Sequence, residues 1–207
     1  SAGCIASCLY SAGRGKFSNV QNSRINKANY FVTDKKVFLV QLLKEIRKEI
    51  KKASDKNEKI AFRLNGTSDI DFVYLLNKHL DFDIDLLNYD KVFFYDYTKS
   101  LPRAKRYLNS KNYTLTFSKS ETNDLEVQEA LNLGINVAAV FSDELPSTYK
   151  GVKVVDGDTS DLVMLKHKKV ILGLKAKGPA KKDTSGFVIN SDNAILESAM
   201  YNFGTNH

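Results

Sequence analysis

Cysteine and tryptophan are scarce in this chain of 207 residues, which has two cysteines and no tryptophan. So few cysteines cannot build the disulfide framework of a small secreted domain, and we expect a reducing compartment. No apolar run approaches the roughly 18 residues that a membrane-spanning helix needs. The first residues also lack the basic-then-apolar order of a signal peptide. The sequence therefore predicts a soluble cytoplasmic protein without a membrane partner.

Familiar catalytic motifs are missing as well. The chain has no nucleophile elbow, Walker loop, HExxH pair or dinucleotide-binding GxGxxG. The loop AGRGKF, residues 12–17, has only two glycines and no strand before it, so it is a poor match to a phosphate cradle. His79, His167 and His207 show no metal-binding spacing, and each is expected at the surface.

What the chain does have is enough apolar sequence for an ordered core. Its hydrophobic content of 43% and aromatic content of 11% predict a single α/β domain over residues 1–207. Within that domain we expect residues 1–30 to be a loop region with cysteine and glycine. Residues 179–207 are expected to form a loop and a final helix.

Basic residues outnumber acidic ones by 31 to 24, giving a formal net charge of +7. A basic surface attracts phosphate, so phosphorylated small molecules, nucleotides and nucleic acids are the partners to consider. In residues 44–56, however, acids interleave with the lysines, as on a solvated helix face. Residues 175–183 have few acids and contain glycine and proline, which is typical of a loop that can meet an anion.

Apolar spacing divides the chain into alternating strands and helices. Residues 34–53 have helical periodicity. Buried strands are predicted at 59–69, 91–99, 112–121, 135–143, 151–158 and 168–178, with helical segments at 71–80, 100–110, 122–134 and 191–201. This order implies parallel βα repeats that form a partial or complete TIM-like barrel, with an open doubly wound sheet as the alternative.

In parallel α/β folds the carboxyl ends of the strands line the site. The candidate catalytic residues follow the predicted strands: Arg63, Asn65, Asp69, Asp96, Lys99, Glu121, Lys175 and Lys177. Burying an unpaired charge within or beside an apolar run costs free energy, which favours a polar pocket. Ordinary polar turns also end strands, and both interpretations stay open.

Asp156 and Asp158 also have two interpretations. They could form a cation or acid–base site, or they could belong to a tight turn.

Cys4 and Cys8 are the only metal ligand candidates with a recognisable spacing, CxxxC. Radical S-adenosylmethionine enzymes use CxxxCxxC to place three thiolates on an iron–sulfur cluster. The third position here is Ser11, and serine is a poor ligand for soft iron. Three interpretations remain: two buried structural cysteines, a metal or iron–sulfur site completed by residues outside this chain, and a redox pair.

A series of motifs resembles a family of bacteriophage and plasmid proteins of unknown activity, the gene product 88-like proteins. In chain order the motifs are GCIASCLYSAGRG (3–15), RLNGTSD (63–69), FYDYTK (94–99), LTFSKSE (115–121), NVAAVF (136–141), VVDGD (154–158), GLKAKG (173–178) and DTSGFV (183–188). The resemblance covers nearly the whole chain and implies a bacterial host cytoplasm. Family members carry a strand and a further cysteine before the position of Ser1, which implies a missing first strand and third thiolate.

Two functions from different classes follow. The first is a βα-barrel enzyme, or a degenerate one, with a polar pocket at the strand ends and a cysteine-based metal or iron–sulfur site. Its likeness to radical S-adenosylmethionine barrels is a fold-level analogy. The second is a non-catalytic phage protein that binds nucleic acid or another partner. Its anion-binding residues would be Arg14, Lys16, Arg24 and Lys27, together with the lysines of residues 175–182.

Overall fold

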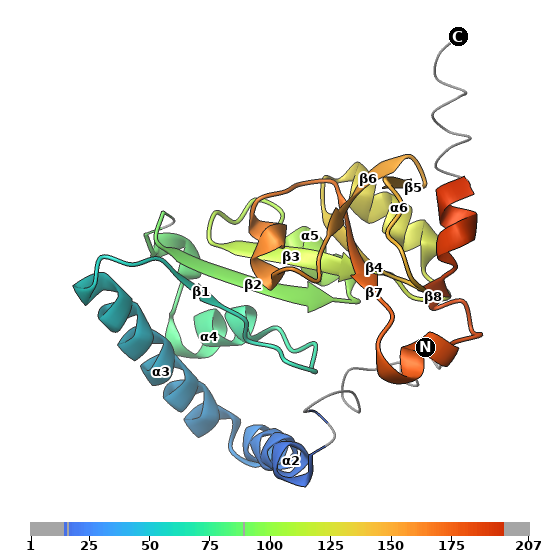
Figure 1. Cartoon of the computed structure of the whole chain (residues 1–207). Coiled ribbons are helices and arrows are strands. Elements are labelled where there is room, and N and C mark those ends of the chain that lie inside the picture. Colours follow the sequence, from blue (N-terminus) through green and yellow to red (C-terminus); the bar gives the residue numbers. More distant parts are fainter. Residues whose placement is uncertain (1–14, 16, 89, 197–207) are drawn as a thin grey trace. The chain divides into compact units, whose positions relative to one another are not determined.

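The computed structural model describes residue 15, residues 17–88 and residues 90–196 (Figure 1). The described residues form two compact units. The amino-terminal unit contains residues up to 96 together with 109–114, and the carboxy-terminal unit contains 97–108 and the residues from 115 onward.

The amino-terminal unit begins with two consecutive helices. α2 is Ser18–Thr33 and α3 is Lys35–Asp55. Asp34 separates them and caps α3, since its side chain accepts a hydrogen bond from the Val37 backbone N–H at 3.2 Å. The helix predicted over residues 34–53 is confirmed, and its buried residues are Leu39, Leu43, Ile46 and Ala53.

The expectation of a loop over residues 1–30 is wrong for residues 18–30, which belong to α2. These residues contain neither glycine nor proline, so nothing in them interrupts a helix. α2 also buries none of its residues. A helix without a buried face has no apolar periodicity, and the sequence pattern therefore does not reveal it.

The rest of the amino-terminal unit is a short parallel strand pair with its connections. β1 (Ile60–Phe62) pairs with β2 (Val92–Thr98), Ile60 opposite Val92. Between them lie α4 (Phe72–Leu80) and the 3-10 turn η3 (Ile84–Leu86). Alternate residues of β2 are buried, and within this unit they include Phe94 and Asp96, neither of which has any exposed surface.

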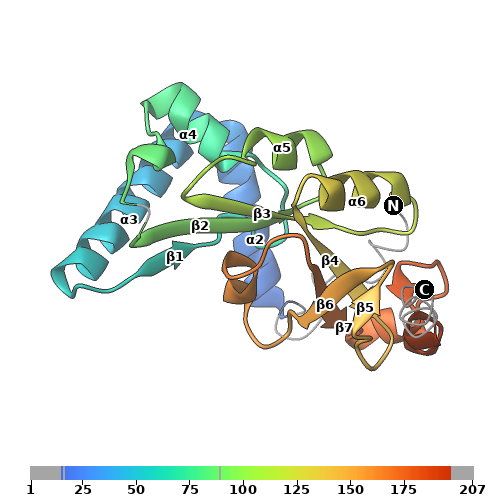
Figure 2. The same cartoon turned by 90° about the horizontal axis from the view of Figure 1, so that it is seen from above.

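The carboxy-terminal unit holds most of the strands. Its elements are α5 (Leu101–Arg106), β3 (Tyr113–Ser118) from Leu115 onward, α6 (Asp124–Asn132), β4 (Asn136–Phe141), β5 (Thr148–Tyr149), β6 (Val152–Asp156), η4 (Asp161–Leu165), β7 (Ile171–Lys175), η5 (Gly178–Lys182) and β8 (Val188–Ile189), followed by helical residues 191–196. α5 and α6 lie on the same side of the strands (Figure 2). Phe117, Val137, Ile171 and Leu172 form the centre of the core.

The strand order is β1-β2-β3-β4-β7-β6-β5, with β8 also paired to β4. β4 is parallel to β3, β7 and β8, and β7 is parallel to β6, whereas β5 is antiparallel to β6. The prediction of an α/β fold with parallel strands is confirmed. Among the described strands the sheet is open, with β1 and β5 at its ends, so these strands do not close the predicted barrel. No helix in the described part is long and apolar enough to cross a membrane.

Candidate functional site

The candidate catalytic residues are divided between the two units. Arg63, Asn65, Asp69 and Asp96 belong to the amino-terminal unit. Lys99, Glu121, Lys175 and Lys177 belong to the carboxy-terminal unit. Each group is therefore a separate candidate site.

Asp96 is the centre of a buried polar network in the amino-terminal unit. Its Oδ1 accepts a hydrogen bond from the Asn65 backbone N–H at 2.9 Å, and its Oδ2 accepts from Asn65 Nδ2 at 2.9 Å and from the Tyr113 hydroxyl at 3.0 Å. Asn65 Oδ1 accepts in turn from Ser68 Oγ at 2.7 Å and from the Ile70 N–H at 3.0 Å. These bonds hold the loop after β1 against β2.

The other two residues of this group lie at the surface. Arg63 follows the last residue of β1 and is exposed; its Nε donates to the Asn65 carbonyl at 2.9 Å. Asp69 is exposed on the same loop. The structure thus brings Asn65 and Asp96 together in the interior. Because three described donors already bind the Asp96 carboxylate, this geometry favours anchoring of the loop over chemistry.

In the carboxy-terminal unit β3 and β8 both pair with β4, β3 along the first residues of β4 and β8 along its last residues. The pairing of β3 with β4 ends where the Lys119 N–H donates to the Ala138 carbonyl at 2.9 Å. Further along β4, Val140 lies opposite Val188 of β8. The segment that leads into β8 therefore adjoins the carboxyl end of β3.

Hydrogen bonds to Asp183 fix the turn formed by residues 183–188, which leads into β8. The Asp183 carboxylate accepts hydrogen bonds from the Val188 N–H at 3.0 Å and from Ser185 Oγ at 2.7 Å, and Ser185 Oγ accepts from the Phe187 N–H at 3.3 Å. Gly186 has a φ of +88°, a conformation that favours glycine. Burial raises the pKa of Asp183, but the hydrogen bonds from Val188, Ser185 and Gly186 outweigh it and leave the pKa lowered.

The ordered segment positions Phe187 beside a candidate residue. The Lys99 ammonium lies 5.7 Å from the centre of the Phe187 ring, within the range of a cation–π contact. Lys99 comes from the end of β2 and is exposed. Sequence reasoning singled out Lys99 but missed Phe187, whose only signal was its place in the motif DTSGFV.

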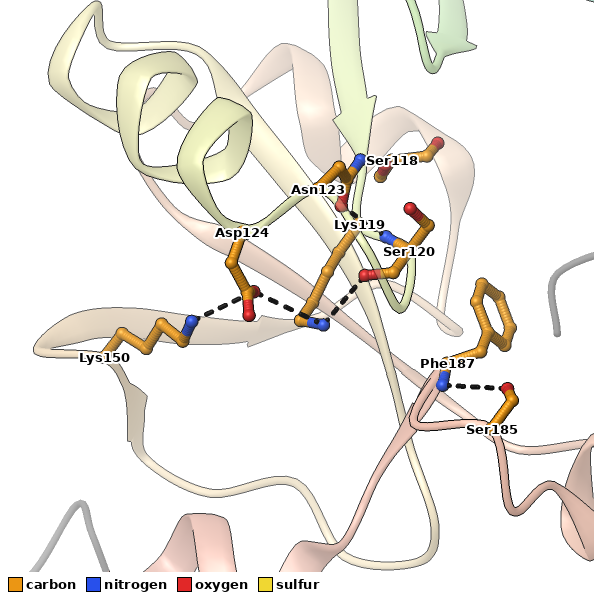
Figure 3. A network of polar contacts seen from close by, with 8 residues as sticks. All are labelled: Ser118, Lys119, Ser120, Asn123, Asp124, Lys150, Ser185 and Phe187. Atoms are coloured by element: carbon orange, nitrogen blue, oxygen red, sulfur yellow. Dashed lines mark hydrogen bonds and ion pairs between the residues drawn. The ribbon is translucent and has the colours of Figure 1, made fainter. Parts of the chain in front are cut away.

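The loop after β3 is held by Asn123. Its Oδ1 accepts from the Ser120 N–H at 2.7 Å, and its Nδ2 donates to the Ser118 carbonyl at 3.0 Å. In Figure 3, Lys119 extends toward Asp124 and Lys150, whereas Ser118 and Ser120 lie on the side of Phe187. The half-buried Glu121 follows on this loop. The two sides of this loop thus carry different groups.

Lys119 is a buried cation at the end of β3 that is not among the candidate catalytic residues. Its side chain is 7% exposed, and Nζ donates to the Ser120 carbonyl at 3.1 Å and lies 3.5 Å from Asp124 Oδ1. Lys150 Nζ lies 3.0 Å from the same oxygen (Figure 3). Burial raises the pKa of Asp124, but the two lysines outweigh it and leave the pKa lowered. Asp124 therefore neutralises only part of the positive charge at this point.

Asp158 connects the ends of β6 and β7. Its Oδ1 accepts from Lys177 Nζ at 2.6 Å, and its Oδ2 accepts from the Lys175 backbone N–H at 2.9 Å. Asp156 Oδ1 accepts from the Asp158 N–H at 2.8 Å, which is the geometry of a tight turn. The described residues contain no group of three or more histidine, cysteine or acidic side chains that could hold a metal ion. Lys177 remains 58% exposed despite its ion pair.

The lowered pKa of Asp183 predicts a pH-dependent stability. Ionised Asp183 stabilises the fold above its unfolded pKa, and this contribution is lost as pH falls from about 5 through the lower pKa of the folded state. We expect Asp183→Asn to lower the free energy of unfolding by about 1 kcal/mol at pH 7 and by less near pH 3. Urea unfolding at several pH values measures this. The exposed Asp192→Asn is the control, and an effect of Asp183→Asn that does not shrink in acid contradicts the argument.

The remaining predicted residues lie elsewhere. Cys4, Cys8, Arg14 and Lys16 are outside the described residues. Arg24 and Lys27 lie on α2 of the amino-terminal unit. The described geometry therefore tests neither the metal candidates nor half of the anion-binding candidates.

The comparisons with known proteins identify the family. A family model described as "Gene product 88" matches residues 1–191, which include all the motifs on which the resemblance depends. No match was found among curated proteins, and none among solved structures. Since the match spans most of the sequence, this chain belongs to the gene product 88 family.

Proposed function

We propose that this chain binds a phosphorylated small molecule or a nucleotide at the carboxyl edge of its carboxy-terminal unit, as an enzyme or as a degenerate enzyme that keeps the binding site. The observation that carries the proposal is the pairing of Lys99 with Phe187 at the junction of β3 and β8. Exposed Lys175 and Lys177 lie at the carboxyl end of β7, on the same edge of parallel strands.

The chemistry of these side chains suits such a ligand. Ammonium groups donate charge-assisted hydrogen bonds to phosphate oxygens. An aromatic ring next to a cation offers a stacking surface for a base. Asp183 and Asn123 fix the two loops that carry the site, so binding would cost little ordering of the backbone.

Calorimetric titration with ATP, inorganic pyrophosphate and adenosine tests the proposal. We expect ATP and pyrophosphate to bind and adenosine to bind much more weakly, because the lysines supply most of the affinity. Binding of adenosine equal to that of ATP, or no binding of either anion, would reject a phosphate site.

The radical S-adenosylmethionine version of the proposal also needs an iron–sulfur cluster. Cys4, Cys8 and Ser11 do not fit a cluster held by three thiolates, so a third cysteine would have to come from outside this chain. Anaerobic reconstitution of the full family-length chain with iron and sulfide tests this version. A brown protein with bound iron and sulfide supports it, and a colourless protein without bound metal removes it. The phosphate site stands without the cluster.

A further inference from the structure

α2 is attached to the amino-terminal unit mainly near its last turn. The Phe31 ring lies 5.3 Å from Phe38 and 5.6 Å from Phe72, and the Tyr30 hydroxyl donates to Gln41 Oε1 at 3.3 Å. None of the 16 residues of α2 is buried. In Figure 1 the helix lies beyond the amino-terminal end of α3. A helix that contributes so little to the core has side chains available for another purpose.

One face of α2 is made of amide, hydroxyl and ammonium groups. The residues that line a shallow groove along it, called here the asparagine face, are Asn19, Asn22, Ser23, Asn26, Lys27 and Tyr30. Their spacing of three and four residues places them on one side of the helix. Among the described residues, the side chains of Asn22 and Asn26 have no hydrogen-bond partner. This face therefore carries polar groups that the fold itself does not use.

The charge on α2 itself is of one sign. α2 contains Arg24 and Lys27 and no acidic residue, and Lys35 and Lys36 begin the next helix. Asp34, the acid between them, caps α3. Near the end of α3, by contrast, lysines form ion pairs with acidic residues of the same helix. Lys51 Nζ lies 3.4 Å from Asp55 Oδ2, and Lys52 Nζ lies 2.6 Å from Glu49 Oε1.

We propose that the asparagine face of α2 binds double-stranded DNA, with the helix in the major groove. An α-helix with its side chains is about 10–12 Å wide, and the groove is about 12 Å wide. Asparagine offers a donor and an acceptor together, which matches the edge of adenine in that groove. The basic residues contact phosphates and supply affinity independent of sequence.

An acidic protein surface would use the cations of α2 but would leave its asparagine amides without matching groups. Duplex RNA is also a poorer fit, because its major groove is too deep and narrow for a helix. The asparagine face belongs to the amino-terminal unit and the proposed phosphate site to the other unit. The two proposals are therefore independent, and each can fail alone.

Fluorescence anisotropy with an A·T-containing DNA duplex at several salt concentrations tests the inference. We expect affinity to fall linearly with salt on logarithmic axes, and Lys27→Gln to reduce that slope by about 1. Lys51→Gln makes the same charge change at the far end of α3 and is expected to leave the slope unchanged.

A second pair of variants tests which face of α2 makes the contact. Asn26→Glu is expected to weaken DNA binding by about tenfold or more, because it places a carboxylate against the groove. Ala28→Glu makes the same charge change on the nearly opposite face of the helix and is expected to have a much smaller effect. Circular dichroism of both variants confirms that they remain folded.

Three outcomes would overturn the inference. They are absence of binding at low salt, equal loss of affinity in Asn26→Glu and Ala28→Glu, and tighter binding of a single strand or of duplex RNA with the same sequence. The last outcome would show that the surface recognises a different nucleic acid.

Discussion

Replacement of Asp96 by alanine is expected to lower the free energy of unfolding by about 3–5 kcal/mol, because it removes a buried carboxylate that several donors share. The substitution leaves the Asn65 N–H, the Asn65 amide and the Tyr113 hydroxyl without their common acceptor in the interior. The loop that follows β1 loses its attachment to β2 for the same reason. Urea unfolding at pH 7 measures the change.

Two further variants distinguish the loss of the Asp96 hydrogen bonds from the mere loss of a negative charge. Asp69→Ala removes a carboxylate from the exposed part of the same loop and should change stability by no more than about 0.5 kcal/mol. Tyr113→Phe removes one donor and should cost about 1 kcal/mol, with strong non-additivity when it is combined with Asp96→Ala. A loss below about 1 kcal/mol for Asp96→Ala would show that the network does not stabilise this unit.

Neutralising both lysines at the end of β7 is expected to weaken the binding of ATP and of pyrophosphate by about 10- to 100-fold. Lys175→Gln with Lys177→Gln removes two charge-assisted contacts to phosphate, and each factor of ten in affinity corresponds to about 1.4 kcal/mol. The fold should be little affected, because Lys177 is 58% exposed in its ion pair with Asp158, and Asp158 keeps its hydrogen bond from the Lys175 backbone N–H. Calorimetry measures the affinity for ATP and pyrophosphate, and the midpoint of thermal unfolding measures the stability of the fold.

Lys168→Gln is the control for these lysines, compared with Lys175→Gln and Lys177→Gln made singly so that each variant removes one charge. Lys168 is exposed and precedes β7, so it lies at the opposite end of the same strand. It carries the same charge but should leave nucleotide binding unchanged. If Lys168→Gln weakens binding as much as the substitutions at the carboxyl end, the effect reflects net charge, and the proposed site is wrong.

Local patterns predicted most of the secondary structure. The apolar stripe of α3 and the buried runs that become β2, β3, β4 and β7 are all visible in the sequence, because each buries a periodic or continuous set of side chains. Closure of the sheet could not be predicted in this way. The order of the described strands depends on β7 pairing between β4 and β6, a long-range choice that strand periodicity does not encode.

The candidate site was predictable to a smaller extent. Asp96 stood out as a charge within an apolar run, and the structure explains that position through Asn65 and Tyr113, donors from two other parts of the chain. Lys119 and Phe187 were missed as site residues. Lys119 follows a strand as many surface lysines do, and Phe187 gains its position from the turn that Asp183 organises far along the chain from Lys99.

Nuclear magnetic resonance of the isotope-labelled chain during titration with ATP tests the central claim most directly. The phosphate site predicts saturable shifts of the backbone amides of Lys99, of residues 118–121, of residues 175–177 and of the segment 185–188 that holds Phe187. Amides at the amino ends of β3 and β7 should move little. Shifts that are absent, or that are confined to residues away from this carboxyl edge, would contradict the proposed function.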